Sequence, residues 1–160
     1  MKKLKFLNRL IKEGKLELVE PSEDVKKSYL EKADNSLRAA KILLQNGLYE
    51  NSVVDSYYAM YNSLLALLFK VGIKSENHSG SIILLKELFN SDELYKKISF
   101  AKEERIDKQY YVASKKNFVL TEDLAKEMGG MAEDFLISMK LFISRVNTGD
   151  ITGFRAAFQM

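Results

Sequence analysis

The chain has 160 residues, 46% of them hydrophobic, and a net charge of +3 from 25 basic and 22 acidic side chains. This size supports one hydrophobic core, the absence of cysteine excludes disulfides and thiolate metal sites, and the near balance of charge argues against a dedicated duplex-DNA binder. No apolar run approaches the roughly 20 residues that span a bilayer, so we expect a cytoplasmic protein without membrane contact.

Residues 1–21 predict a short accessory helix and a linker. Apolar residues recur at three- and four-residue spacing from Leu4 to Glu13, and Gly14 ends the pattern. Lys15 to Glu20 alternates in polarity, but a lone strand would have no partner, so we interpret it as a linker. Six basic side chains crowd this region and are interpreted as a solvated face: Lys2, Lys3, Lys5, Arg9, Lys12 and Lys15.

Two long helices follow. Ser22 is a candidate N-cap for an amphipathic helix whose apolar positions recur at the 3.6-residue period until Gly47. The second helix, from Tyr49 to Val71, ends at Gly72 and carries a broad apolar stripe. Because it has no charged residue between Asp55 and Lys70, we expect it to be the central helix of the fold.

The next segments predict two shorter helices. A polar loop over Lys74–Ser79 precedes a helix near Ser81–Asn90, and another helix begins at Ser91-Asp92 and runs through Arg105. Periodicity is lost from Asp107 to Leu120, which predicts a loop.

The last long helix is predicted from Thr121 to Val146, with Gly149 closing it. Gly129-Gly130 inside it predicts either a close helix contact or a kink, since each glycine costs roughly 1 kcal/mol relative to alanine. Residues 148–160 form a tail that either docks on a partner or is loosely ordered.

Several sequence pieces occur in the order seen in HEPN domains, and the likeness covers roughly Ser22 to Val146. The pieces that carry it are Tyr29-Leu30-Glu31-Lys32-Ala33, Ala39-Ala40-Lys41-Ile42-Leu43-Leu44, Gly47-Leu48-Tyr49, Tyr57-Tyr58-Ala59-Met60-Tyr61-Asn62, Ala66-Leu67-Leu68, Gly72-Ile73, His78-Ser79-Gly80, Arg105 and Tyr110. The chain therefore resembles a small prokaryotic or archaeal HEPN protein.

The resemblance implies an all-α fold, an antiparallel up-down bundle of four to five helices, here with a short accessory N-terminal helix. We divide the chain into an N-terminal helix and linker (1–21), a HEPN-like bundle (22–147) and a C-terminal tail (148–160). The resemblance also implies a homodimer and a minimal nucleotidyltransferase as partner, in a toxin-antitoxin-like or nucleotide-handling pair.

Ribonucleases that belong to this family carry an Arg-x4-6-His motif, in which histidine moves a proton and arginine stabilises charge on phosphorus. Here Arg105 is followed five residues later by Tyr110, and a phenol with an ordinary pKa near 10 is a poor base at neutral pH. The resemblance therefore indicates the non-ribonuclease branch, although Gln109 replaces the acid usual there, and Arg105, Tyr110 and Lys108 become candidate phosphate ligands.

Two further residues are candidates outside that motif. His78, the only histidine, precedes a predicted helix and either binds an anion there or orders the loop through local backbone contacts. Tyr58 points to another face than Tyr57 and Tyr61, so we place it at a groove or dimer contact and assign the other two rings to the core.

Three functional hypotheses remain. The leading one is a non-catalytic HEPN-like module that partners a minimal nucleotidyltransferase and binds nucleotide or RNA phosphate. The alternative is a divergent metal-independent ribonuclease using His78 and Arg105. A tetratricopeptide scaffold ranks last, because no repeat recurs at a period near 34 residues. No metal site and no cofactor are expected.

Overall fold

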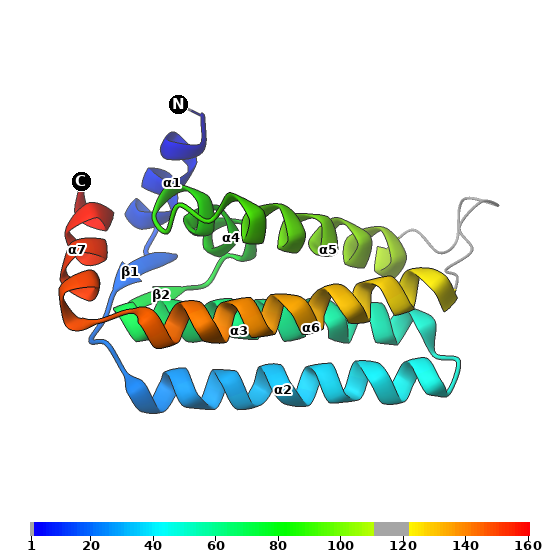
Figure 1. Cartoon of the computed structure of the whole chain (residues 1–160). Coiled ribbons are helices and arrows are strands. Elements are labelled where there is room, and N and C mark those ends of the chain that lie inside the picture. The colour runs from blue at the N-terminus through cyan, green and yellow to red at the C-terminus, as the bar shows by residue number, and fades with distance from the viewer. Residues whose placement is uncertain (1, 111–121) are drawn as a thin grey trace.

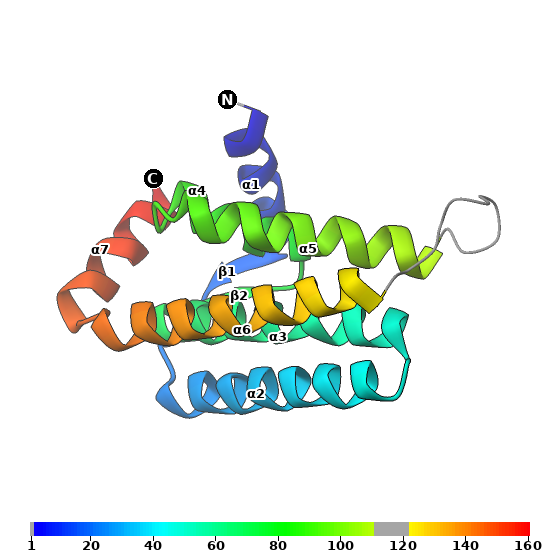
Figure 2. The same ribbon diagram turned by 45° about the vertical axis from the view of Figure 1, so that its right-hand side comes forward.

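The computed structural model describes residues 2–110 and 122–160, with side chains described over 4–105 and 122–160. The described elements, in chain order, are α1 (Lys2–Lys12), β1 (Leu16–Leu18), α2 (Glu23–Gln45), α3 (Tyr49–Val71), β2 (Ile73–Ser75), α4 (His78–Glu87), α5 (Asp92–Tyr110), α6 (Glu122–Arg145) and α7 (Thr148–Gln159). Four long helices, α2, α3, α5 and α6, lie side by side as an antiparallel bundle (Figures 1 and 2). The all-α bundle expected from the sequence is confirmed.

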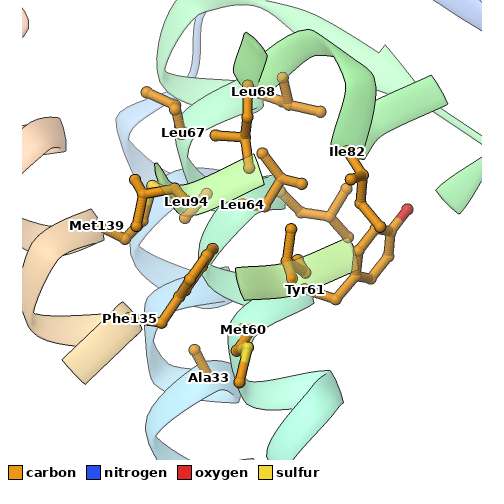
Figure 3. Packing of buried hydrophobic residues seen from close by; sticks show 14 of the residues in the cluster. Ala33, Met60, Tyr61, Leu64, Leu67, Leu68, Ile82, Leu94, Phe135 and Met139 are labelled. Carbon is orange, nitrogen blue, oxygen red and sulfur yellow. The ribbon is translucent and has the colours of Figure 1, made fainter. Parts of the chain in front are cut away.

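Helix α3 is the centre of the bundle. It packs against α2, α5 and α6, its middle contacts α4, and its C-terminal end contacts α7. Its apolar side chains meet those of α2, α4, α5 and α6 in one core, where Met60 and Leu64 lie near Phe135 of α6 (Figure 3). Its predicted bounds, Tyr49 to Val71, and its predicted central position are both confirmed.

Local chemistry fixes the ends of the first two long helices. The Ser22 hydroxyl accepts a hydrogen bond from the Val25 backbone N–H at 3.2 Å, which caps α2 as predicted. Gly47 and Gly72 follow α2 and α3 with φ values of +72° and +78°, a left-handed conformation that glycine adopts without steric cost.

The predicted linker over residues 15–20 is wrong in part, because it contains a strand. Leu16–Leu18 pairs antiparallel with Ile73–Ser75, and the Lys74 ammonium lies 3.1 Å from the Glu17 carboxylate across the pair. The partner strand, Ile73–Ser75, overlaps the start of the polar loop predicted over Lys74–Ser79. This short ladder ties the N-terminal segment to the end of the central helix.

Other predicted boundaries also shift. Helix α4 begins at His78, three residues earlier than expected, and ends at Glu87. Helix α5 starts at Asp92 as predicted but continues to Tyr110, so residues 107–110 are helical and not loop. The rest of the predicted loop, together with the predicted cap Thr121, lies outside the described residues.

The C-terminal tail is helix α7, and it docks on the molecule itself. Asn147 and Asp150 form a reciprocal capping box at its start, so Gly149 lies inside its first turn instead of closing α6. The Arg155 Nη1 atom lies 2.7 Å, 3.1 Å and 2.9 Å from the backbone oxygens of Val19, Val71 and Gly72. One guanidinium thus holds α7 at the junction of α3 with the strand pair.

Gly80 allows the N-terminal helix α1 to lie close to α4. A Cβ atom built on Gly80, in the first turn of α4, would lie 2.5 Å from Leu10 Cδ1 of α1 and 3.4 Å from Leu16 Cδ1 of β1. A larger residue at position 80 would therefore require the Leu10 side chain of α1 to move.

Gly72→Ala should destabilise the protein more than Gly47→Ala. Both positions have positive φ, which costs an alanine about 1 to 2 kcal/mol. At Gly47 the new Cβ meets nothing within 4 Å, whereas at Gly72 it would overlap Arg155 Nη1 and the Val19 oxygen. We expect losses of about 1 and about 2 to 5 kcal/mol in urea unfolding. Equal losses would contradict the close contact with Arg155.

Gly130→Ala should stabilise the protein. The predicted close contact at Gly129-Gly130 is not found, because a Cβ atom at either glycine meets nothing within 4 Å among the described residues. Helix α6 runs through both positions, and Gly130 is exposed. We expect a gain of about 0.5 to 1 kcal/mol in unfolding free energy by urea titration. A loss would indicate a contact that glycine alone permits.

Candidate functional site

The candidate site lies where the middle of α3 meets the start of α4 and the later part of α5. Helix α3 contributes Tyr57, Tyr58 and Tyr61, whose positions i, i+1 and i+4 point within an arc of about 100° around the helix. Helix α4 contributes its first residue, His78, and α5 contributes Arg105. We call these five residues the tyrosine-histidine cluster.

The imidazole of His78 is held by the α3 tyrosines. Its ring stacks on Tyr61, with the ring centres 3.9 Å apart and the planes 11° apart. Its Nδ1 atom lies 2.6 Å from the Tyr57 hydroxyl, and Tyr58 approaches edge-on at 6.3 Å. The predicted loop-ordering role through local backbone groups is therefore not what the geometry shows, since the bond of His78 reaches another helix.

The protonation states of His78 and Tyr57 follow from their burial. Burial, and secondarily the nearby Arg105 and Lys102 cations, lowers the pKa of His78 to about 4. Burial also raises the pKa of the Tyr57 hydroxyl well above its usual range. The phenol therefore stays protonated and forms a hydrogen bond with Nδ1. At neutral pH His78 is uncharged, and its Nδ1 atom is engaged in that bond.

Polar side chains before and within the first turn of α4 hold the start of this helix in place. The Asn77 side chain accepts a hydrogen bond from the Gly80 N–H at 2.8 Å and caps the helix. Ser81 Oγ lies 2.7 Å from Ser75 Oγ and 3.2 Å from the Tyr61 hydroxyl. These contacts position the turn that presents His78 and Ser79.

Arg105 contacts two of the tyrosines, Tyr57 and Tyr58. Its guanidinium carbon is 4.7 Å from the centre of the Tyr57 ring, and Nη1 donates to the Tyr58 hydroxyl at 3.0 Å. Its Nε atom is buried and has no hydrogen-bond partner within the described part of the chain.

One turn earlier on α5, Lys102 adds a second cation. Its ammonium donates to Ser79 Oγ at 2.6 Å, and burial, followed by the proximity of Arg105, lowers the pKa of Lys102. Over residues 4–105 and 122–160, no carboxylate lies within ion-pair distance of either cation. Glu103 lines the same groove of about 190 Å³ as Lys102 and Ser79, without an ion pair to Lys102. Two neighbouring cations without a paired carboxylate favour an anionic ligand.

The comparison with known families decides the classification. The HEPN domain family matches residues 26–141, which is well over half of the chain. The chain belongs to the HEPN family. The match includes α3, α4 and α5, so every residue of the tyrosine-histidine cluster lies within the HEPN domain.

Relatives support this classification. The chain is 29% identical over 121 residues to "Putative toxin MJ0605" of Methanocaldococcus jannaschii, an alignment covering 73% of this chain and 82% of the relative. It is 30% identical over 120 residues to a UPF0332 protein of Archaeoglobus fulgidus, covering 72% of this chain and 93% of the relative. A shorter alignment of 55 residues reaches 42% identity with UPF0332 protein glr0978 of Gloeobacter violaceus, covering 34% of this chain and 44% of the relative.

The structure brings together three of the five predicted site residues of this HEPN domain. Tyr58, His78 and Arg105 share the cluster, with Tyr57 between the imidazole and the guanidinium. Lys108 and Tyr110 belong to the last turn of α5, and their side chains lie outside the described residues.

Sequence reasoning missed Lys102 and Ser79 and treated Tyr57 purely as core. Tyr57 is indeed fully buried, but its hydroxyl bonds His78. Lys102 could have been found, because residues three apart on a helix are neighbours and Lys102 precedes Arg105 by that spacing. Ser79 gave no such signal, because its partner is 23 residues away in the chain.

The described residues of the HEPN protein contain no group of three or more histidine, aspartate or glutamate side chains that could hold a metal ion. Likewise, none of the helices that the structure describes is both long and apolar enough to cross a membrane.

Acid should unfold the protein partly through His78. Between pH 6.5 and about 4 the unfolded chain binds a proton at this histidine and the folded chain does not, so stability falls as the pH is lowered. Because the imidazole is partly exposed and solvent screens its charge, we expect a contribution of about 1 kcal/mol. Unfolding free energies of wild type and His78→Gln, measured from pH 7.5 to 5, should converge toward acid pH. Parallel curves would show that His78 titrates normally in the folded protein.

Proposed function

We propose that this HEPN protein is a non-catalytic module that binds a phosphate group of nucleotide or RNA at the tyrosine-histidine cluster. We further propose that it pairs with a minimal nucleotidyltransferase in a toxin-antitoxin-like or nucleotide-handling system, and that it acts as a homodimer. The supporting observation is the pair of adjacent cations, Arg105 and Lys102, that have no paired carboxylate in the described residues.

Phosphate suits this pair for chemical reasons. The guanidinium is fixed by one bond to Tyr58 and by the Tyr57 ring face, so it keeps further N–H groups for a ligand. A neighbouring ammonium adds a second charge, and two donors of this kind match the oxygens of one phosphate. The neutral His78 adds no competing positive charge at physiological pH.

The protonation state of His78 argues against the ribonuclease alternative. Proton transfer is most effective when the catalytic pKa lies near the working pH, and the pKa of His78 is about 4. Its Nδ1 is also engaged by the Tyr57 hydroxyl. The two residues of that hypothesis, His78 and Arg105, do share one cluster, so the alternative is tested directly.

The proposal of a partner rests on similarity to other proteins alone. One relative is named as a toxin, and a toxin needs an antitoxin to hold it in check. The nucleotidyltransferase is the partner implied by the resemblance of the motif around Arg105 and Tyr110 to non-ribonuclease HEPN proteins. Coexpression with a nucleotidyltransferase encoded beside this chain, followed by size-exclusion chromatography, tests the pairing and the dimer together. Separate elution at micromolar concentration would contradict the pairing.

Lys102→Met and Arg105→Met should each weaken binding of ATP and of a short RNA by about 10- to 100-fold, since each removes a charge-assisted hydrogen bond. Calorimetric titration at fixed salt measures the effect. Lys96→Met is the matched control, because Lys96 lies on the same helix, is 71% exposed and pairs with Asp92. The control should bind like wild type, and adenosine without phosphate should not bind.

Two results would contradict the proposal. One is ATP and RNA binding that neither substitution weakens. The other is RNA cleavage in chelator that His78→Gln and Arg105→Met abolish, which would establish the ribonuclease alternative.

A further inference from the structure

A groove at the end of the molecule that carries both termini lies apart from the tyrosine-histidine cluster. Its main part has a volume of about 600 Å³ between α1, β1 and the end of α7, and a smaller part of about 80 Å³ reaches α4. Both parts are lined by Asn8, Ile11, Phe158 and Met160, so they form one surface feature, the terminal groove. Figures 1 and 2 show α1 and α7 at the same end of the molecule as the two termini, with β1 below α1.

The terminal groove has an apolar lining that remains open to solvent. Leu4 is 59% exposed and Ile11 is 37% exposed, while Leu7 and Leu16 below them are buried. Exposed apolar side chains gathered in a concavity are typical of an interaction site, whereas isolated ones on a convex surface are not.

The helix on one side of the groove is basic. Lys12 lines the groove, Lys5 and Arg9 are also exposed on α1, Arg9 lies 3.8 Å from Glu13, and α1 itself has no acidic residue. Residues 1–15 carry six basic and one acidic side chain, a net charge of +5, so the remaining residues together carry −2. Of the two carboxylates that line the groove, Glu17 is neutralised by Lys74 at 3.1 Å, and Glu87 lies at the α4 end.

These elements are additions to the shared HEPN core. The family match covers residues 26–141, and α1, β1 and α7 all lie outside it. The core itself therefore does not account for the groove, which exists because Arg155 holds α7 and Gly80 admits α1.

We propose that the terminal groove binds an acidic amphipathic helix of a partner protein. A helix presents apolar side chains at three- and four-residue spacing to a groove of this kind, and acidic residues on its flanks would meet Lys5, Arg9 and Lys12. This binding does not depend on the phosphate proposal, because it uses none of the cluster residues.

Two other occupants fit less well. A membrane surface would need the main apolar face of α1, but Leu7 and Leu10 of that face are buried in the protein's own core. A second copy docked symmetrically would bring two segments of charge +5 together, and like charges across an interface oppose association.

The test uses the full chain and a labelled synthetic peptide of about 16 residues, with leucines on one helical face and glutamates elsewhere. Fluorescence anisotropy should show micromolar binding that weakens with salt. Ile11→Asp should weaken it about tenfold, and Lys12→Glu about three- to tenfold. Ile42→Asp and Lys27→Glu, the same changes at exposed positions of α2, should leave it unchanged.

A peptide of the same composition with its leucines spread around the helix should bind at least tenfold more weakly. Four outcomes would overturn the proposal: no binding at 1 mM, equal binding of the two peptides, binding indifferent to both α1 substitutions, and preferential binding of anionic phosphatidylglycerol vesicles. Dimerisation that Ile11→Asp abolishes would replace the partner helix with a second copy.

Discussion

The tyrosine-histidine cluster follows from the burial of α3 on nearly all its faces. A buried hydroxyl without a hydrogen-bond partner is costly, so the tyrosines on this helix require partners from its neighbours. The partners are His78 for Tyr57, Arg105 for Tyr58 and Ser81 for Tyr61. The bonds that attach α4 and α5 to the central helix therefore also fix the imidazole and the guanidinium.

A ribonuclease of this kind needs a proton-transfer group beside a positive charge, and burial affects the two differently here. Low polarity around His78 favours its neutral form, and the guanidinium of Arg105 lies against the neighbouring Tyr57 ring. This contrast supports the proposed phosphate-binding role over the ribonuclease alternative.

Long-range pairing explains what the sequence could and could not predict. The 3.6-residue period located α2, α3 and α6, and the apolar, nearly uncharged run of α3 identified it as central. The strand pair was missed because Glu17 and Lys74 lie far apart in the chain and each strand is only three residues long. The docking of helix α7 was missed because Arg155 reaches carbonyls far away in the chain, whereas the capping pair Asn147 and Asp150 at its start was visible in the sequence.

For the candidate site, the sequence predicted individual residues but not the contacts between them. Arg105 was identified from the family motif, His78 from its place before a predicted helix and Tyr58 from its face of α3, but their mutual arrangement required the fold. No spacing rule joins His78 to Tyr57, since the two are 21 residues apart and the contact depends on how α4 lies on α3.

Because Gly80 has no side chain, the accessory helix α1 packs directly against the turn that carries His78 and Ser79. Leu10 and Leu16 rest directly on the backbone that carries His78 and Ser79, with no intervening atoms to absorb a shift. Shortening the chain to residues 26–141 would remove Leu10 and Leu16 from the backbone at Gly80. The 160-residue chain is therefore the proper starting point for engineering the candidate site.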